Sequence, residues 1–159
     1  MQEKEPSRTA LAAAAHRAAH QLVEQGAIFA DPLAVPILGA DPKILVEQAQ
    51  ANPRARGMRL FIAMRSSVAE TALRTGVEDR GVRQLVVLGA GLDTFAYRNP
   101  FADRLKVFEV DHPATQAWKR RRLSEAGVAL PASLVFTPVD FECDRLLDRL
   151  SESGFDPAQ

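Results

Sequence analysis

The chain has 159 residues, of which 47% are hydrophobic and 25% are charged, and these values are ordinary for a globular domain. Its 20 basic and 20 acidic residues balance, so the net charge gives no attraction to nucleic acid or to an anionic membrane, and we expect neither partner. No stretch reaches the roughly 20 apolar residues that a membrane-spanning helix needs. The single cysteine, Cys143, excludes an intramolecular disulfide, and residues 1–8 lack the apolar core of a secretory signal, so we expect a cytoplasmic protein.

Residues 1–80 are predicted to form a helical region. Residues 8–24 are rich in alanine, the best helix former, and contain no glycine or proline. The Asp-Pro pairs at Asp31 and Asp41 each predict a helix start, because aspartate caps a helix and proline suits its first position. Residues 56–75 carry apolar side chains at a spacing of four, which indicates a further helix.

Residues 81–159 are predicted to form a different kind of structure, in which strands and helices alternate. Three short apolar runs bounded by turn residues indicate buried strands, and two other segments indicate helices. This alternation predicts right-handed parallel crossovers and therefore an α/β fold with a doubly wound parallel sheet. The strands are expected at residues 84–88, 105–110 and 134–139, and the helices at residues 113–125 and 144–151.

Three strands are half of a usual doubly wound sheet, in which the first strand lies near the centre. The first predicted strand, residues 84–88, would then have an unpaired edge, and it is apolar without a protecting charge. We therefore expect residues 81–159 to be the amino-terminal half of such a domain, with the other half missing or on another chain. Self-association, or pairing with a second chain, would satisfy this edge. In the alternative, a local helix covers it.

A glycine-rich turn, Gly89-Ala90-Gly91, directly follows the first predicted strand. A turn of this kind lets a ligand approach the backbone closely. The pattern is Gly-x-Gly-x-x-Thr, so the third glycine of a dinucleotide-binding turn is absent, and the acidic Asp93 would repel a pyrophosphate. A cationic or zwitterionic ligand fits better, such as one with the amino group of a methionine moiety. Taken alone, the pattern also fits a plain tight turn.

Acidic side chains follow the other two predicted strands. Asp111 stands about 20 positions after Gly89, where a carboxylate can accept hydrogen bonds from ribose hydroxyls. Glu109 has the same strand parity, but Asp111 is favoured because it lies nearer the carboxyl end, where ligands bind. Asp140 and Phe141 follow the third strand, where they suit an adenine group. The alternatives are that Asp111 or Asp140 simply caps the helix that follows it.

The segment of residues 86–98, Val-Val-Leu-Gly-Ala-Gly-Leu-Asp-Thr-Phe-Ala-Tyr-Arg, is the most specific of several that resemble the leucine carboxyl methyltransferase family. The closer likeness is to its bacterial branch of S-adenosyl-L-methionine-dependent methyltransferases. It extends over about residues 25–157. The other similar segments are residues 28–34, 63–66, 107–113 and 119–123.

This resemblance implies a class I, Rossmann-like methyltransferase fold and the cofactor S-adenosyl-L-methionine. Arg65 would pair with the carboxylate of the cofactor's methionine part. Asp111 would hold the ribose, and Asp140 with Phe141 would hold the adenine end. The cofactor-binding residues expected from the motifs and the resemblance together are Arg65, Gly89, Gly91, Asp111, Asp140 and Phe141.

The predicted function is methyl transfer from S-adenosyl-L-methionine to an oxygen atom. The acceptor would be a small molecule or a carboxylate compound, and the oxygen would belong to a carboxylate or a hydroxyl group. An ionised carboxylate needs no general base, so no catalytic residue is assigned. One alternative is an NAD-dependent oxidoreductase, against which the absent third glycine and Asp93 count. The other is a truncated, non-catalytic fragment or interaction module, which the short chain favours.

Two basic clusters are predicted to lie on solvent-exposed helix faces. His16 and His20 share one face, but the intervening residues lack the glutamate of a zinc protease, so we predict no metal site. Residues 119–122, Lys-Arg-Arg-Arg, are a short basic run of the kind that usually marks the solvent face of an amphipathic helix.

Overall fold

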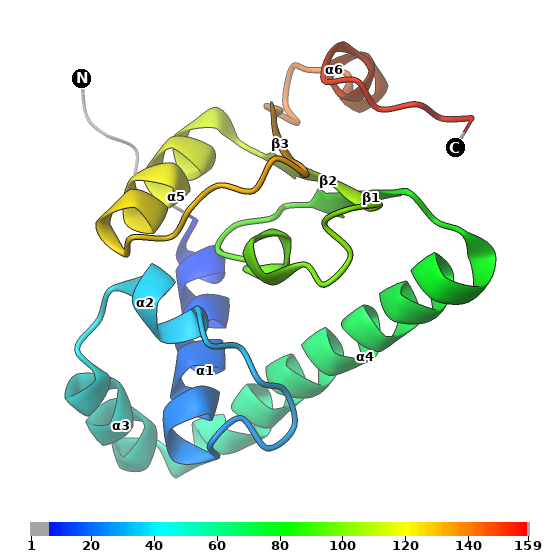
Figure 1. Cartoon of the computed structure of the whole chain (residues 1–159). Coiled ribbons are helices and arrows are strands. Elements are labelled where there is room, and N and C mark those ends of the chain that lie inside the picture. Colours follow the sequence, from blue (N-terminus) through cyan, green and yellow to red (C-terminus); the bar gives the residue numbers. More distant parts are fainter. Residues whose placement is uncertain (1–6, 159) are drawn as a thin grey trace.

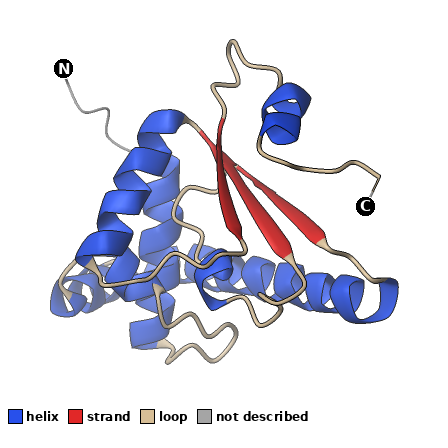
Figure 2. Cartoon of the chain, turned by 45° about the horizontal axis from the view of Figure 1, so that its top comes forward, coloured by secondary structure: helices blue, strands red, loops and turns tan. Residues whose placement is uncertain are grey.

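Three parallel strands lie side by side in a computed structural model of the chain, which describes residues 7–158 (Figures 1 and 2). They are β1 (Gln84–Leu88), β2 (Lys106–Asp111) and β3 (Leu134–Pro138), in the order β1-β2-β3. The predicted α/β fold with a parallel, Rossmann-like sheet is confirmed, and each strand lies within one residue of its predicted bounds. Residues 1–6, on which part of the expected localisation depends, lie outside the described residues.

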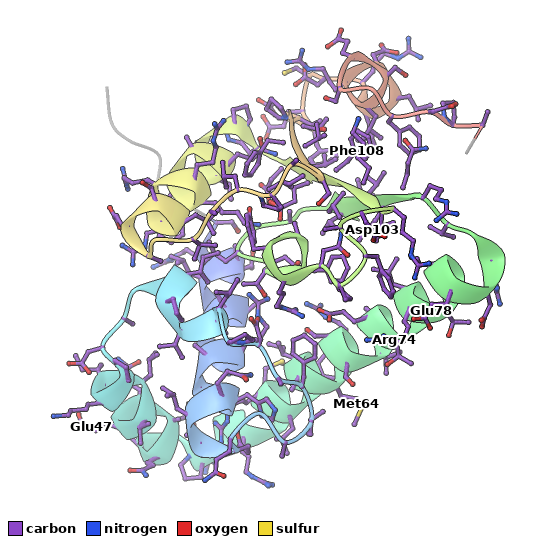
Figure 3. The ribbon with its side chains drawn as sticks, in the orientation of Figure 1. Glu47, Met64, Arg74, Glu78, Asp103 and Phe108 are labelled. Atoms are coloured by element: carbon purple, nitrogen blue, oxygen red, sulfur yellow. The ribbon has the colours of Figure 1, made fainter. Side chains whose placement is uncertain are left out.

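Helices cover both faces of the sheet, as a doubly wound arrangement requires (Figure 2). On one face, α5 (Pro113–Glu125) belongs to a core in which its Leu123 packs with Phe136 of β3. On the other face, α6 (Leu146–Glu152) packs its Leu150 against Phe108 and Val110 of β2. Figure 3 labels Phe108 on the side of the sheet toward α6. Because successive strand residues point to opposite faces, Val107 of β2 points away from α6 and belongs to a separate core cluster with Phe95 and Leu105.

Within the described residues, four α-helices precede the sheet: α1 (Arg8–Val23), α2 (Ala34–Leu38), α3 (Pro42–Ala51) and α4 (Arg56–Arg80). Ala14 and Ala18 of α1 are buried, and their small side chains let neighbouring helices pack closely against α1 (Figure 1). Ala14 also belongs to a core cluster with Leu92, which follows β1, and Leu123 of α5. A division into two domains at residue 80 stays a proposal. Within residues 7–158, none of the helices combines the length and apolar character needed to cross a bilayer.

Two helix predictions need correction. Asp41 caps α3 as predicted, since its Oδ1 accepts a hydrogen bond from the Lys43 amide at 2.8 Å, but the other Asp-Pro pair does not begin a helix. Helix α2 begins at Ala34, because Asp31 is drawn into buried contacts described below. Helix α4 continues five residues beyond its predicted end and stops at Gly81, in the left-handed region at φ 68°. Burial of Val77 in the core outweighs the poor helix propensity of the preceding glycine.

The outer edge of β1 has no strand partner among the described residues. Leu88, at the end of β1, is 58% exposed. Along α4, Phe61, Met64 and Val68 are also more than half exposed, and Figure 3 shows Met64 on the outer side of the helix. A cavity of about 340 Å³ lies between α4 and β1, so α4 does not seal this region. Association of this edge with a second copy or another chain stays a prediction.

The ion pair between Glu24 and Arg59 ties the end of α1 to α4. Arg59 is buried and donates from Nε and Nη2 to the Glu24 carboxylate, at 2.8 and 2.7 Å. These hydrogen bonds hold the pKa of Glu24 below its ordinary value, against the opposing effect of burial. A carboxylate with a depressed pKa stabilises the fold above its ordinary pKa of about 4.3, and this stabilisation is lost as the pH falls through the folded-state value.

We expect Glu24→Gln to lower the free energy of unfolding by about 1–2 kcal/mol at pH 7, because the charge-assisted hydrogen bonds are weakened. The difference from the unsubstituted chain should shrink as the pH falls toward 3, and urea unfolding at both pH values measures it. Glu47→Gln, at an exposed position of α3, is the control and should change stability little at either pH. A loss for Glu24→Gln that is equally large at pH 7 and pH 3 would contradict this explanation.

Candidate functional site

The turn after β1, residues 89–93, is here called the glycine loop. Gly89 and Gly91 both have positive φ angles, of 62° and 49°, which side-chain-bearing residues rarely adopt. A Cβ added at Gly89 would meet no atom within 4 Å, so the backbone there faces open space. A Cβ at Gly91 would lie 3.0 Å from the Cβ of Ala10 in α1. The first glycine therefore leaves room for a ligand, and the second lets the loop pack against α1.

Asp111, at the end of β2, faces the glycine loop. Its Oδ2 accepts a hydrogen bond from the Gly91 amide at 2.6 Å, and its Oδ1 accepts one from the His112 amide at 2.7 Å. The alternative that Asp111 caps the next helix is wrong, because His112 caps α5 by accepting at Nδ1 from the Ala114 amide. Asp111 is only partly buried, and each carboxylate oxygen can accept more than one hydrogen bond.

Glu109 lies beneath this site and is not available to a ligand. It is 1% exposed, and its Oε2 accepts hydrogen bonds from Lys119 Nζ at 2.7 Å and from the Tyr97 hydroxyl at 3.2 Å. Burial raises the pKa of the Glu109 carboxyl, and the ammonium of Lys119 opposes that effect. Burial and the nearby Glu109 carboxyl also raise the pKa of Tyr97, which keeps its hydroxyl protonated. Of these two acidic residues of β2, Asp111 is the partly exposed one, and its role in binding a ligand stays a prediction.

Two basic side chains predicted on solvent faces are buried, and those predictions were wrong. Lys119 is 1% exposed because it pairs with Glu109. His20 is fully buried, with its Nδ1 3.3 Å from a Glu24 carboxylate oxygen and its Nε2 3.3 Å from the Ile28 amide nitrogen. In both cases a carboxylate from another turn or element compensates the polar group that is removed from water.

A cavity of about 210 Å³ opens beside the glycine loop. Arg65 of α4, Gly89, Gly91 and Asp93 all line it, so the structure brings three of the predicted residues together. The side chain of Asp93 accepts a hydrogen bond from the Phe95 amide at 2.9 Å. Arg65 and Asp93 also both line the larger cavity between α4 and β1. A guanidinium and a carboxylate therefore border the same space, which suits a ligand that carries both a carboxylate and an amino group.

Asp93 was not among the predicted site residues. The signal that could have identified it was present in the sequence, because an acidic residue in a ligand-binding turn already favoured a cationic or zwitterionic ligand.

Asp140 and Phe141 lie farther along the same edge of the sheet, after β3. The Asp140 Oδ2 is 3.8 Å from Nε2 of His112, the neighbour of Asp111, so Asp140 is close to the predicted site. Its Oδ1 accepts from the Glu142 amide at 3.1 Å, which shapes the local turn rather than capping α6. The Phe141 side chain is 57% exposed and packs in none of the core clusters. His112, which links the two acidic residues, was missed.

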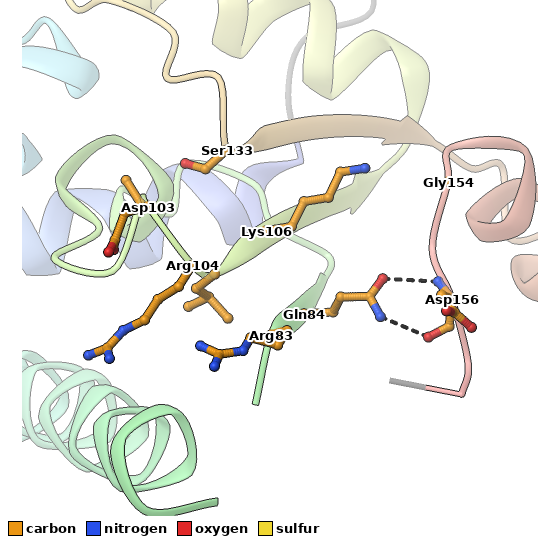
Figure 4. Close-up of a pocket in the computed structure, with 10 residues that line it drawn as sticks. Arg83, Gln84, Asp103, Arg104, Lys106, Ser133, Gly154 and Asp156 are labelled. Carbon is orange, nitrogen blue, oxygen red and sulfur yellow. Dashed lines mark hydrogen bonds between the residues drawn. The ribbon is translucent and has the colours of Figure 1, made fainter. Parts of the chain in front are cut away.

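Another cavity, of about 440 Å³, lies elsewhere (Figure 4). It is lined at the amino ends of β1 and β2 by residues such as Gln84 and Lys106. Gln84 exchanges two hydrogen bonds with the backbone of Asp156 there, at 2.8 and 2.9 Å. None of the predicted site residues lines this cavity. Ligands of doubly wound folds bind at the carboxyl ends of the strands, so the smaller cavity beside the glycine loop is the better candidate.

Comparisons with known proteins agree with the expected resemblance. The family model described as leucine carboxyl methyltransferase matches residues 10–159. A protein of Bacillus subtilis (strain 168), YktD, provisionally named an S-adenosyl-L-methionine-dependent methyltransferase, is 49% identical over a region covering 47% of this chain and 25% of that protein.

Mycobacterial relatives match more of the chain, and they carry the same provisional name without a further designation. One from Mycobacterium avium (strain 104) is 34% identical over 95% of this chain and 52% of its own length. One from Mycobacterium marinum (strain ATCC BAA-535 / M) is 34% identical over 98% of this chain and 52% of its own length. The chain thus spans about half the length of these mycobacterial relatives.

Proposed function

Because the chain belongs to the leucine carboxyl methyltransferase family, we propose that its glycine loop binds S-adenosyl-L-methionine for methyl transfer to an acceptor oxygen of a carboxylate or hydroxyl. One observation carries the proposal: the bare, outward-facing backbone of Gly89 lies beside a cavity that Arg65 and Asp93 also line. Asp111 is held against the same loop through the Gly91 amide.

The residues around the loop fit the chemical groups of this cofactor. Arg65 would pair with the carboxylate of the methionine part, and Asp93 would accept hydrogen bonds from its ammonium group. A side chain at Gly89 would fill the space that the cofactor needs. Asp111 would accept hydrogen bonds from the ribose hydroxyls. When bound, the cofactor supplies a methyl group already activated by its sulfonium sulfur.

The adenine end is assigned to Asp140 and Phe141. The position of Asp140 beside His112 supports a role at the far end of an extended ligand that begins at Arg65. The exposed ring of Phe141 offers an apolar surface for a flat adenine group. This assignment rests on their place at the carboxyl end of β3 and on the family resemblance.

The same geometry disfavours a nicotinamide dinucleotide. Thr94 stands where a dinucleotide-binding loop has its third glycine, and it is fully buried. The carboxylate of Asp93 borders the cavity beside the loop, where it would repel a pyrophosphate.

Methyl transfer to a carboxylate does not require the protein to supply a general base. The acceptor is ionised at neutral pH, so the protein needs mainly to align it with the methyl group and exclude water. The ionisable side chains lining the cavity beside the loop are Arg17, Arg65 and Asp93, and we assign a general-base role to none of them. A carboxylate acceptor is therefore the simpler match to the described residues, while a hydroxyl acceptor would require a base from elsewhere.

Calorimetric titration of the chain with S-adenosylhomocysteine and, separately, with NAD tests this proposal. We expect saturable binding of S-adenosylhomocysteine and no binding of NAD. Binding of NAD alone would favour the oxidoreductase alternative. Binding of neither compound would favour a non-catalytic fragment or an interaction module.

We expect Asp111→Ala to weaken S-adenosylhomocysteine binding by about 1–3 kcal/mol, because ribose hydroxyls would lose a charged acceptor. Calorimetry gives the dissociation constant, and Asp103→Ala is the control. Asp103 is an exposed aspartate that lines the opposite cavity (Figure 4), so its replacement should leave the affinity unchanged. Equal affinities for both variants would remove Asp111 from the site.

A further inference from the structure

Asp31 is a charged residue that the fold buries almost completely. It is 1% exposed and lies in the turn between α1 and α2. Its Oδ2 is 2.9 Å from Nε of Arg17 and accepts a hydrogen bond from the Thr94 hydroxyl at 2.7 Å. Its Oδ1 is 3.4 Å from Nε of Arg98 and accepts from the Leu33 amide at 3.1 Å. One carboxylate thus joins segments that are far apart in the sequence.

The partners of Asp31 contact the carboxyl-terminal end of the glycine loop. Arg17 also donates from Nη2 to the backbone carbonyl of Leu92, which is inside the loop. Thr94 follows the loop directly and is fully buried. Arg98 donates from Nε to the Thr94 hydroxyl oxygen at 3.1 Å, so the two partners of Asp31 also contact each other.

The cluster extends to the helix that carries Arg65. Arg98 makes a two-pronged contact with the Glu70 carboxylate of α4, of which one hydrogen bond measures 2.8 Å. The resulting set of two guanidinium groups and two carboxylates is neutral as a whole. We call this set, together with the Thr94 hydroxyl, the Asp31 cluster; its members are Arg17, Asp31, Glu70, Thr94 and Arg98.

The glycine loop is held largely by contacts with other segments, such as the Gly91 amide with Asp111 and the Ala90 amide with the Val110 carbonyl. Within the loop, the Asp93 amide donates to the Ala90 carbonyl at 2.7 Å, but the two glycines have no side chains that could restrict their backbone. Burying charges is costly and contributes little net stability, while it can specify one geometry over others. The Asp31 cluster contacts the loop at its carboxyl-terminal end, where the chain continues into a short helix, η2 (Phe95–Arg98).

We propose that Asp31 is a positioning residue, which holds the glycine loop through Arg17 and Thr94 in the shape that receives the cofactor. The inference rests on the proposed function for the identity of the ligand. It assigns a role to Asp31 within residues 28–34, a segment that lines neither cavity bordering the glycine loop. Asp31 itself does not line those cavities, so it acts only through its partners.

The test uses Asp31→Asn, which keeps the side-chain shape and removes the charge, and Thr94→Val, which removes only the hydroxyl. We expect both to weaken S-adenosylhomocysteine binding about tenfold or more and to speed amide hydrogen exchange at Gly91 and Asp93 by a similar factor. Thr94→Val keeps every charge of the cluster, so it remains informative if Asp31→Asn fails to fold.

Two control variants separate positioning from a general loss of stability. Asp41→Asn makes the same change in the other Asp-Pro pair, where Asp41 caps α3 and lines neither cavity bordering the glycine loop. Glu24→Gln weakens a different ion pair of a buried arginine, Arg59 of α4, and neither residue lines the cavity beside the loop. Both should leave the affinity for S-adenosylhomocysteine and the exchange at Gly91 and Asp93 unchanged.

The readouts distinguish the two proposals. If the unsubstituted chain binds no S-adenosylhomocysteine, the proposed function fails, but the exchange rates still decide whether Asp31 shapes the loop. Unchanged exchange at Gly91 and Asp93 in both Asp31→Asn and Thr94→Val would overturn the positioning role. Faster exchange with unchanged affinity would overturn its link to cofactor binding.

Discussion

Replacing Lys119 by methionine is expected to lower the free energy of unfolding by about 3–5 kcal/mol, because it leaves the Glu109 carboxylate buried without a counter-ion. Lys119 is 1% exposed, and its ammonium group lies 2.7 Å from Glu109 Oε2 and 5.2 Å from the centre of the Tyr97 ring. The other oxygen, Oε1, already has no hydrogen-bond partner among the described residues. Methionine preserves the length of the side chain, so the effect should come mainly from the lost charge.

Urea unfolding at pH 7 measures this loss, with Lys43→Met on an exposed part of α3 as the control. Removing both charges, in Glu109→Leu with Lys119→Met, should recover much of the stability, since apolar residues can replace a buried pair at little cost. The deficit of Lys119→Met should also shrink at lower pH. An unpaired buried carboxyl has a raised pKa, so its penalty is absent below the unfolded pKa and grows as the pH rises. A deficit below about 1 kcal/mol at pH 7 would contradict the importance of this pair.

Alanine substitutions at the two loop glycines are expected to have different main effects, on stability at Gly91 and on ligand binding at Gly89. Both positions have positive φ angles, so each variant carries backbone strain of about 1–2 kcal/mol. At Gly91 the new Cβ would also lie 3.0 Å from Ala10, and crowding of this kind costs about 1–3 kcal/mol more. At Gly89 the Cβ enters open space, so Gly89→Ala should remain folded but bind S-adenosylhomocysteine at least about tenfold more weakly.

Thermal or urea unfolding with calorimetric titration separates the two outcomes. Adding Ala10→Gly to Gly91→Ala removes the crowding atom, so the double variant should be less destabilised than the sum of its single substitutions predicts. If Gly89→Ala binds as tightly as the unsubstituted chain, the open space above that residue is not the ligand site. Equal stability losses at the two glycines would contradict the packing role of Gly91.

The regular elements could be predicted closely because their signals are local. The helix of residues 113–125 has the predicted bounds, since Pro113 suits its first position and the Gly127 turn follows its end. The three apolar runs likewise became strands within one residue of their predicted ends. The end of α4 was wrong because burial of Val77, which depends on contacts with distant residues, overrode the local effect of Gly76.

Buried polar contacts could not be predicted, because their partners are distant in the sequence. Nothing near Lys119 indicates that Glu109 lies beneath the α5 helix until the sheet is built. Asp31 was expected to cap a helix, yet its main partners include Thr94, 63 positions away. A short basic run or an Asp-Pro pair has the same local pattern whether it is solvated or buried, so only the tertiary structure separates the two.

The candidate site could be predicted in part from the sequence. The glycine loop and the acidic end of β2 were predicted from their spacing, and the structure joins them through the Gly91–Asp111 hydrogen bond. Arg65 was expected only from the family resemblance, and α4 brings it to the cavity that Gly89 borders. Asp93 was used to predict the charge of the ligand, but it was not predicted to be a residue of the site. The roles of these residues in binding stay predictions.

Binding of S-adenosylhomocysteine at the glycine loop can be observed directly by an amide NMR titration of the isotope-labelled chain. We expect saturable shifts concentrated at Gly89, Gly91, Asp93 and Asp111, with little change around Gln84 and Lys106 at the opposite end of the strands. Saturable shifts confined to that opposite end, or none at the glycine loop at millimolar ligand, would contradict this expectation.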